Sequence, residues 1–540
     1  MKKFNFIYVL FAFVGFESCT SDMDVVSEDT RVLTDEVLYS TPAGYKQALA
    51  GVYGNLSLTG TGDAGSSFLQ GIDAGTSQFA RCMWYLQNFT TDEMIWSYEG
   101  SDAGTAELNR NTWNSNNPFL LGMYSRTMAE VAFVNEFLRQ STPAKLSARG
   151  ITDPADVANI ETYRNEVRAL RAYAYYNLMD LYGKAPFVTA NDPLNFNGPQ
   201  YDRSQLFTFI EDEMLAVIPN LKPARTNEYG RLDQAFAKMV LAKIYLNAEV
   251  YIGEKRYLDC MTQCSEIIAS GYILNPDYLN NFKADNDTSP EMIFTLQADG
   301  VTTQNYGATT VACNGQVGSL PASDYSGSAI GVGGWGGALR VRKQFVQKFD
   351  GIDYDYDVRK TITGGGPRSL DISDISNKDQ GYILRKYSNI SSTGIPGPNS
   401  TFVDTDFPLF RLGDVFLMYA EAQMRNDGAT NGSTTTNASA TSLGYLNDLR
   451  DRANGYDFPD FTQSQVNLQF IIDERSRELH WEGHRRQDLV RFGLYTGGVY
   501  NWAWKGNGIN GISIPAYRKL FPLPAQSIAA NPNLIQNPGY

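Results

Sequence analysis

Both histidines of the chain, His480 and His484, lie four residues apart near its end. Side chains at this spacing share one face of a helix, so the pair could bind zinc. The helical zinc-protease motif is H-E-x-x-H and its inverse is H-x-x-E-H, whereas this chain reads His-Trp-Glu-Gly-His. Glu482 stands at the wrong offset, and Gly483 weakens a helix. The sequence therefore predicts neither a metal site nor a catalytic residue here.

Acidic and basic residues alternate at helical spacing around the two histidines. Glu474 lies three residues before Arg477, and Arg485 lies three residues before Asp488. Apolar residues recur between these charges, so the pattern predicts a helix, a turn near Gly483 and a second helix. We expect a packed corner that holds a buried network of ion pairs.

The composition is that of a globular body rather than a disordered or membrane-spanning chain: 43% of the 540 residues are hydrophobic and 19% are charged. The formal net charge is −14, and such a surface repels phosphate backbones, so nucleic acid is not expected as a partner. The 32 Tyr and 7 Trp exceed what a core alone requires, so we expect some of them to meet a ligand.

Residues 1–18 have the features of a targeting segment. Lys2 and Lys3 precede an apolar run that is too short to span a bilayer stably. The run ends in Phe-Glu-Ser-Cys, which resembles a bacterial lipobox and makes Cys19 the expected lipidated first residue of the mature chain. The acidic residues after Cys19 are similar to a signal that exports some lipoproteins to the cell surface. Secretion without a lipid is the alternative.

Apolar positions at helical spacing also predict the elements that position these motifs. Pro42 marks the start of the first predicted helix, and Gly183 and Pro186 mark the end of the third. The predicted helices span about residues 38–55, 79–89, 161–183, 235–251, 254–270, 414–425 and 443–453.

Residues 280–406 differ from the helical segments because they are rich in Gly, Ser, Asn and Asp and contain short strand-like pieces such as Met292 to Leu296. Trp96 and Tyr98 stand in another polar stretch, predicted to be a loop, where an aromatic ring is free to meet a ligand. The Pro-rich end, Phe521 to Tyr540, is expected to lie extended over the body without regular structure.

The segment from Glu474 to Gly493 resembles a pattern of the SusD/RagB family of surface nutrient-binding lipoproteins, E-R-x-x-E-L-x-x-E-G-x-R-x-x-D-L-x-R-x-G. Further matches are Arg411 to Val415, Arg168 to Tyr173, the ending after Phe521 and the lipobox, so the resemblance covers the mature chain. The matching positions of the long pattern are Glu474, Arg475, Glu478, Leu479, Glu482, Gly483, Arg485, Asp488, Leu489, Arg491 and Gly493.

This resemblance implies a mainly α fold, in which tetratricopeptide-like helix pairs support an irregular, loop-rich lobe with a few short strands. A signal peptide over residues 1–18 would precede a single domain over residues 19–540. The scaffold is expected mainly at about 38–55, 160–275 and 407–495, and the ligand lobe mainly at about 56–120 and 280–406.

The resemblance also implies a role: non-catalytic binding of an oligo- or polysaccharide at the outer membrane, and its delivery to a SusC-like TonB-dependent transporter. A lipid on Cys19 would anchor the protein facing the cell exterior, and no cofactor is implied. Aromatic faces would stack on sugar rings while polar groups bind hydroxyls. The candidate residues are first Trp96, Tyr98 and Tyr306, and then Asp73, Asn305, Tyr325, Trp335 and Arg368.

Two other functions stay open at this point. The RagB side of the family implies capture of peptides instead of glycans. A glycoside hydrolase would need two carboxylates about 5–10 Å apart, one of them with a raised pKa, and no pair in the sequence stands out for this role. The sequence does not identify the sugar or linkage, because binding loops vary freely on such a scaffold.

Overall fold

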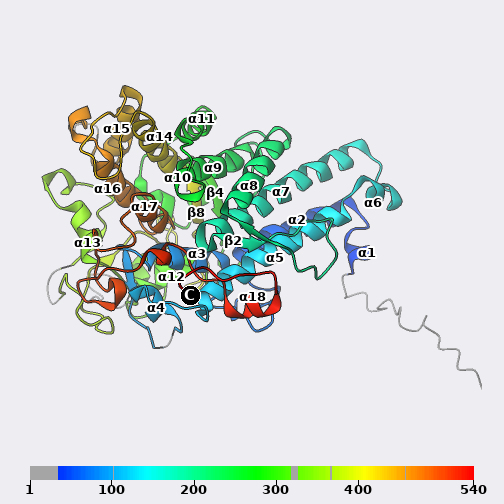
Figure 1. The fold of residues 1–540 in the computed structure, drawn as a ribbon, viewed down its shortest axis with the longest axis horizontal. Helices are drawn as coiled ribbons and strands as arrows, with labels where there is room; N and C mark the ends of the chain where they lie inside the picture. The colour runs from blue at the N-terminus through cyan, green and yellow to red at the C-terminus, as the bar shows by residue number, and fades with distance from the viewer. Residues whose placement is uncertain (1–33, 101, 318–325, 365–367, 456–457) are drawn as a thin grey trace, which may run out of the picture.

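The computed structural model describes residues 34–100, 102–317, 326–364, 368–455 and 458–540. Long helices lie side by side across the upper part of Figure 1, from α2 on the right to α15 on the left. These helices are α2 (Pro42–Ser57), α5 (Pro118–Gln140), α7 (Pro154–Tyr182), α8 (Arg203–Val217), α9 (Gln234–Leu246), α11 (Tyr257–Ile268), α14 (Leu412–Asn426), α15 (Ala440–Asn454) and α16 (Leu468–Leu479).

Consecutive helices of this array pack against one another. Helix α2 contacts α5, α5 contacts α7, α7 contacts α8, α8 contacts α9, α9 contacts α11 and α11 contacts α14, which in turn contacts α15 and α16. A helix buries its apolar stripe only against another element, so each helix covers its neighbour and one continuous core results. The predicted mainly α fold of paired helices is confirmed.

Shorter elements fill the lower part of Figure 1, where α4, α12 and α13 lie. The strands form four antiparallel pairs: β1 (Met94–Trp96) with β5 (Leu339–Val341), β2 (Lys184–Pro186) with β3 (Gln200–Asp202), β4 (Met292–Leu296) with β8 (Phe407–Arg411), and β6 (Ile362–Thr363) with β7 (Ile383–Leu384). The short helices are α1 (Asp35–Leu38), α3 (Phe79–Asn88), α4 (Thr105–Arg110), α6 (Pro143–Ala148), α10 (Ala248–Tyr251), α12 (Ala308–Gly315), α13 (Lys343–Val346), α17 (Arg485–Arg491) and α18 (Ala525–Ala530).

Local sequence explains where the helices begin and end. In α7, the Asp153 carboxylate accepts hydrogen bonds from the amides of Ala155 and Asp156, and Pro154 occupies the first turn. The same helix ends at Gly183, whose φ of +72° is the left-handed conformation that glycine adopts without strain. The sequence signals thus fixed the end of this helix within one residue, although the helix begins seven residues earlier than predicted.

Several parts of the fold differ from the sequence prediction. Helices α5, α6 and α8 extend the array, although no helix was predicted for residues 118–148 or 203–217. The Pro-rich ending does cover the body, since Trp113 Nε1 donates to the Tyr540 hydroxyl at 2.9 Å and Asn537 Nδ2 donates to the Tyr182 carbonyl at 2.7 Å. The expectation that it lacks regular structure was wrong, because α18 forms within it.

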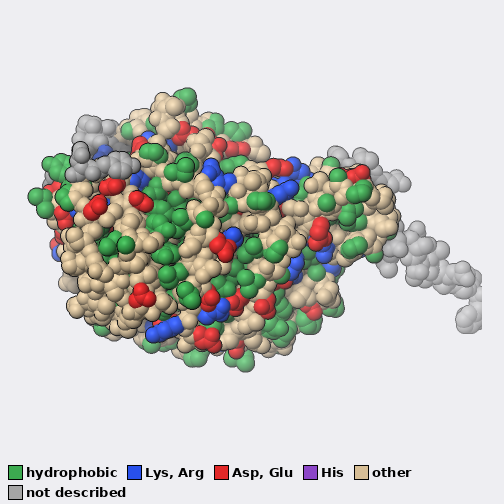
Figure 2. Space-filling view, turned by 90° about the horizontal axis from the view of Figure 1, so that it is seen from above, with side chains coloured by type: hydrophobic (Ala, Val, Ile, Leu, Met, Phe, Trp, Pro, Cys, Tyr) green, Lys and Arg blue, Asp and Glu red, His purple; other side chains and the backbone are tan. Residues whose placement is uncertain are grey.

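The described surface carries charges of both signs. On the face shown in Figure 2, acidic and basic side chains are interspersed rather than gathered by sign. Among the described helices, none combines the length and the apolar composition that crossing a membrane requires.

Candidate functional site

Four half-buried aromatic rings from four separate segments gather in the loop-rich part of the molecule: Tyr98, Tyr306, Trp335 and Phe402, here called the aromatic surface. The Tyr306 and Trp335 ring centroids lie 6.4 Å apart, and those of Tyr306 and Phe402 lie 5.1 Å apart. Each of these side chains is partly packed against the protein and partly exposed, so part of its surface can meet a ligand. Such rings are suited to stack on a flat ligand face.

Strand pairing positions Tyr98. It follows β1, which pairs with β5, and the Tyr98 hydroxyl donates to the backbone carbonyl of Trp335 at 2.8 Å. Gly336 has a φ of +71°, and a Cβ there would lie 2.5 Å from the Tyr98 hydroxyl, so only glycine permits this approach. Lys378 completes the contact, because its Nζ lies 2.6 Å from the same hydroxyl.

Two tight turns position Tyr306 and the polar groups beside it. The Asn305 side chain accepts from the Gly307 amide at 2.7 Å and donates to the Thr303 carbonyl at 3.0 Å, which shapes the chain on both sides of Tyr306. On the neighbouring turn, the Asp73 carboxylate accepts from the amide and the hydroxyl of Thr76. A Cβ on Gly75 would lie 3.9 Å from the Tyr306 ring, so this turn borders the ring directly.

An ion pair lies beside the Asp73 turn. Arg81 donates to Asp102 at 2.8 Å and to the Gly75 carbonyl at 2.7 Å. Burial raises the pKa of the Asp102 carboxyl although the Arg81 charge lowers it, and Arg81 links Asp102 to the turn that Asp73 forms. The polar groups beside the aromatic surface are thus two carboxylates, one paired arginine and Lys378.

The structure separates the predicted binding residues into two groups. Tyr98, Tyr306 and Trp335 come together on the aromatic surface, and Asp73 is exposed beside them. Trp96 is not on a loop, because it ends β1, and its side chain is only 4% exposed beneath Tyr98.

Two further candidates are also buried. Asn305 is 6% exposed, and its amide shapes the turn around Tyr306 as described above. Arg368 is likewise 6% exposed and donates to the Gly381 carbonyl at 2.7 Å. The predicted ligand Tyr325 and the lipidation site Cys19 lie outside the described residues.

Phe402, Lys378 and Asp102 are neighbours of the site that were not predicted from the sequence. Phe402 stands in a polar, Pro- and Gly-bearing stretch, the same signal that selected Tyr98, and that signal could have found it. Lys378 and Asp102 carry no comparable signal, because only the folded chain brings them to the Tyr98 hydroxyl and to Arg81.

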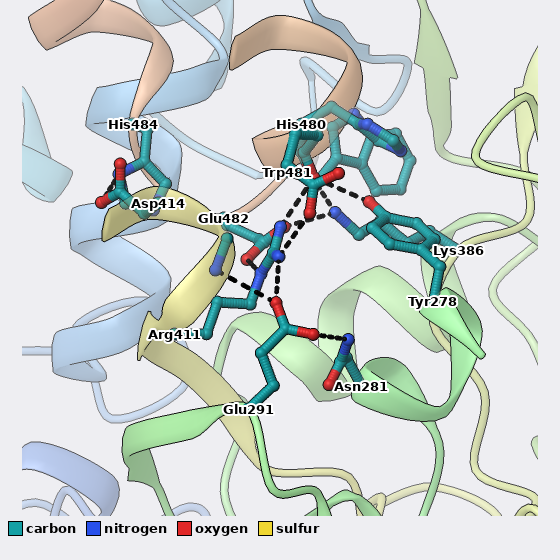
Figure 3. Close-up of polar contacts among 12 residues, drawn as sticks. Tyr278, Asn281, Glu291, Lys386, Arg411, Asp414, His480, Trp481, Glu482 and His484 are labelled. Atoms are coloured by element: carbon teal, nitrogen blue, oxygen red, sulfur yellow. Dashed lines mark hydrogen bonds and ion pairs between the residues drawn. The ribbon is translucent and has the colours of Figure 1, made fainter. Parts of the chain in front are cut away.

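The charged corner predicted near the end of the chain is a buried ion network (Figure 3). Arg411, at the end of β8, donates to Glu291 at 2.7 Å, to Glu478 at 2.6 Å and to Glu482 at 2.6 Å. Arg359 joins Glu478 at 3.0 Å from another side. All of these side chains are at most 1% exposed, so the network ties distant segments together inside the molecule.

The individual partners in this network were only partly predicted. Glu474 does pair with Arg477 at 2.7 Å, as the helical spacing indicated. Arg485 does not pair with Asp488, because its guanidinium reaches both oxygens of Asp92 at 2.7 Å. Asp488 pairs instead with Arg475 at 2.9 Å and with Arg491 at 2.8 Å.

The two histidines belong to this interior and lie on either side of a break between α16 and α17. His480 Nδ1 lies 2.8 Å from the Arg477 carbonyl, while His484 Nδ1 lies 3.1 Å from Lys243 Nζ. Burial lowers the pKa of both imidazoles well below the usual value, which keeps them neutral. Within the described ranges, no group of three or more His, Cys, Asp or Glu is placed to hold a metal ion.

Two glutamates have the raised pKa that a catalytic acid requires. Burial raises the pKa of Glu93 and of Glu130 to about 8. Both are only 1% exposed, and their carboxyl oxygens accept hydrogen bonds from Asn88 and Asn55 respectively. A general acid must reach its substrate, and these side chains are enclosed by the core.

Comparisons with a family model and with known proteins all find relatives of one family. Residues 342–540 match the model of the SusD family. The chain is 31% identical to the starch-binding protein SusD of Bacteroides thetaiotaomicron, over 97% of this chain and 96% of that protein. It is 23% identical to the SusD-like protein P25 of Formosa agariphila, over 98% of this chain and 97% of the other.

Solved structures share the fold. Surface glycan-binding protein A of Bacteroides thetaiotaomicron, in complex with laminarihexaose, superposes with a TM-score of 0.67 at 21% identity, covering 92% of this chain and 99% of that one. Surface glycan-binding protein A of Bacteroides uniformis gives a TM-score of 0.69 at 20% identity with the same coverage. At these identities the structural likeness establishes the architecture alone.

Proposed function

The chain belongs to the SusD family, and from this premise we propose that it binds a neutral glycan at the cell surface without catalysis and passes it to a transporter. The observation that carries the proposal is the aromatic surface, on which the Tyr306 ring lies beside those of Trp335 and Phe402 and Tyr98 is bonded to the Trp335 backbone. A sugar ring has an apolar face that stacks on such rings, and its hydroxyls bind the polar groups at the edge.

The charges beside the aromatic surface favour a neutral glycan over an anionic one. Arg81 there is already paired with Asp102 and bound to the Gly75 carbonyl of the Asp73 turn, and Lys378 contacts the Tyr98 hydroxyl. These cations and the carboxylates of Asp73 and Asp102 balance one another, so an acidic sugar finds no excess of positive charge, whereas hydroxyl groups can donate to the carboxylates. Among relatives, one is named for binding starch and one structure holds laminarihexaose, and both of these are neutral glucans.

We assign the ligand contacts to Tyr98, Tyr306 and Trp335, with Asp73 as a hydroxyl acceptor. Trp96 supports Tyr98 from below, since their ring centroids lie 6.1 Å apart. Asn305 holds the turn that presents Tyr306, and Arg368 holds the backbone at Gly381. Tyr325 stays a predicted contact.

The proposal includes an outer-membrane location through a lipid on Cys19 and a SusC-like TonB-dependent transporter as the partner that receives the glycan. The lipobox-like sequence before Cys19 supports the anchor. One lipid group on a protein gives limited membrane affinity, so the transporter would contribute to retention. Purification of the transporter from the native membrane, followed by detection of this chain in the complex, tests the partnership.

Affinity electrophoresis tests the proposed function. The purified protein is run through gels containing starch, laminarin, xylan or a polygalacturonate. We expect at least one neutral polysaccharide to retard it and the anionic one to have no effect. Burial raises the pKa of Asp404 to about 6, which makes this half-buried carboxyl the residue to test for catalysis. If the protein releases reducing ends and an Asp404→Asn variant does not, the protein is a hydrolase instead. Retention of peptides but of no polysaccharide would establish the RagB-like alternative.

A further inference from the structure

A second aromatic groove lies apart from the aromatic surface and shares no lining residue with it. Its volume is about 340 Å³, at the lower end of the range of small-molecule sites. Three segments form it: the 344–354 stretch, helix α16 and the loop that carries Tyr500. The lining residues are Gln344, Gln347, Lys348, Asp350, Tyr354, Phe470, Asp473, Arg477 and Tyr500.

Three half-buried rings line this groove: Tyr354, Phe470 and Tyr500. Each is held in place by a neighbour. The Arg477 guanidinium lies 4.2 Å from the Tyr354 ring centroid and 5.8 Å from that of Phe470, and the Tyr500 hydroxyl donates to Asp92 at 2.6 Å. Rings fixed in this way lose little freedom when a ligand stacks on them.

The charged groups of the groove balance one another. Lys348 pairs with Asp473 at 2.6 Å, and Arg477 pairs with Glu474 at 2.7 Å. Asp350 lies exposed at the edge. A charged ligand would have to compete with existing ion pairs, whereas a neutral polyhydroxyl ligand can add hydrogen bonds to them.

Two amide side chains add neutral hydrogen-bonding capacity. Gln344 accepts from the Ala503 amide at 3.2 Å through its oxygen, which leaves its NH₂ group to donate elsewhere. Gln347 is exposed at the rim and can both donate and accept. The lining therefore combines rigid rings, which can stack on the apolar faces of a sugar, with amides and paired charges, which can bind its hydroxyl groups.

The groove suits a peptide less well. Peptides are commonly recognised by addition to an exposed strand edge, by a long apolar groove, or by capture of a terminal charge. Here helix α16 and the helical turns of α13 (Lys343–Val346) and η6 (Gln347–Phe349) form two of the walls, so the lining on these sides is helical rather than a strand edge. Lys348 and Arg477 are paired as described above, so among the described lining residues a terminal carboxylate meets no unpaired cation, and a terminal amine meets only Asp350 at the edge.

We infer that this groove is a second carbohydrate-binding site, which takes a short neutral saccharide unit between Tyr354, Phe470 and Tyr500. The inference rests on the proposed function, since it assumes that the protein meets glycan at the cell surface. Two sites on one chain hold a long polysaccharide more tightly than either alone, because the second binding event becomes intramolecular.

The test uses an environment-sensitive fluorophore on a Gln347→Cys variant of the mature chain, with Cys19→Ser to leave one reactive thiol. The other cysteines of the described residues are buried, and burial raises the pKa of the Cys313 thiol, so they resist labelling. A second protein carries the label on Thr302→Cys, an exposed position four residues from Tyr306. Both are titrated with maltoheptaose and with laminarihexaose.

We expect the label at position 347 to respond to at least one of the two saccharides. Its midpoint should not change when Tyr306→Ala and Trp335→Ala disable the aromatic surface. Tyr354→Ala should raise the saccharide concentration at the midpoint of the position 347 titration by at least about 10-fold. The same substitution should leave the response of the label at position 302 unchanged. Tyr517→Phe, which alters a ring in the C-terminal segment, serves as the matched control and should change neither response.

Different failures are distinguishable. A silent label at position 347 beside a responding label at position 302 overturns the second site and leaves the proposed function intact. Silence of both labels toward both saccharides overturns the two together. If the response at position 347 is lost in the variant that carries Tyr306→Ala and Trp335→Ala, it is an indirect effect of the aromatic surface, and the inference is overturned. If the label ignores both saccharides and responds only when purified transporter is added, the groove is a protein-docking surface, which also overturns the inference.

Discussion

The Tyr98 hydroxyl donates a hydrogen bond of 2.8 Å to the backbone carbonyl of Trp335, which lies 237 residues further along the chain. The bond joins the end of β1 to the Gly-rich turn of the lobe and fixes two candidate sugar-stacking residues relative to one another. Lys378 Nζ lies 2.6 Å from the same hydroxyl and 4.5 Å from the Tyr98 ring centroid, so a third segment reinforces the arrangement. The site is therefore largely organised before a ligand arrives.

Tyr98→Phe should weaken glycan binding while leaving the fold intact. The variant keeps the ring but loses the bond to Trp335, and one such bond is worth about 0.5–1.5 kcal/mol. We expect affinity to fall roughly 2- to 10-fold and the midpoint of thermal unfolding to change little. Calorimetric titration with glycan compares wild type, Tyr98→Phe and the control Tyr517→Phe. Equal affinity in all three proteins would show that this bond does not organise the site.

Trp96→Ala should act on stability rather than directly on the ligand. The side chain is 4% exposed and packs against Tyr85, Phe89 and Tyr98, so its loss leaves a cavity. Removing a buried Trp side chain costs about 3–5 kcal/mol of unfolding free energy. Urea denaturation of Trp96→Ala and of the half-exposed Trp335→Ala measures this difference. A Trp96→Ala protein of wild-type stability that no longer binds glycan would make Trp96 a ligand contact after all.

Arg411→Met should destabilise the protein severely. The substitution removes the cation shared by Glu291, Glu478 and Glu482 and leaves each of these buried carboxylates with one partner fewer. Loss of one partner from a buried pair costs about 3–5 kcal/mol.

The matched control for Arg411→Met is Lys46→Met, which breaks an exposed pair with Glu228 whose side chains are 52% and 58% accessible. Its expected cost is at most about 1 kcal/mol. Chemical denaturation measures the free energy of unfolding of both variants. Similar losses of unfolding free energy would mean that burial does not set the strength of this network.

Stability should fall steeply in acid. Burial raises the pKa of Asp92 and Glu421, but the stronger effect of their arginine partners lowers both to about 2, against ordinary values of 3.8 and 4.5. Below their ordinary values, the unfolded carboxyls take up protons that the folded ones refuse, so unfolding is favoured. The free energy of unfolding should therefore decrease from about pH 4.5 towards pH 2.

Denaturation at pH 5, 4 and 3 measures this trend. Asp92→Asn should reduce the slope of the unfolding free energy against pH, because residue 92 then no longer binds a proton. A free energy of unfolding that stays constant over this interval would show that the buried carboxylates are not held ionised by their partners.

Helix existence was predictable where local patterns were strong. The helix ending at Gly183, the turn at Gly483 and the strand from Met292 to Leu296 all follow from spacing and turn residues, and the structure has each of them. Helix α5 was missed because most of its faces are buried, which blurs the apolar stripe on which the periodicity depends. The Asn117-Pro118 pair, a cap followed by a first-turn proline, was the signal that could have revealed it.

The site was predictable only in part, for a physical reason. The polar loop pattern pointed to Tyr98, and the family resemblance added Tyr306 and Trp335 as candidates. Nothing local distinguishes Trp96, which a strand pairing with residues 339–341 draws into the core. The ion network behaves in the same way. The Glu474–Arg477 pair is local and was expected, whereas Arg485 pairs with Asp92 across 393 residues. Such contacts depend on the assembled fold, which spacing along the chain does not report.

The most direct test of glycan binding at the aromatic surface is calorimetric titration with maltoheptaose and laminarihexaose, comparing wild type with a Tyr306→Ala, Trp335→Ala double variant. We expect heat of binding for at least one saccharide in wild type. We also expect the double variant to bind at least about 10-fold more weakly, a loss of about 1.4 kcal/mol or more, with an unchanged unfolding midpoint. Equal affinity in the two proteins would contradict the assignment of the site to these rings.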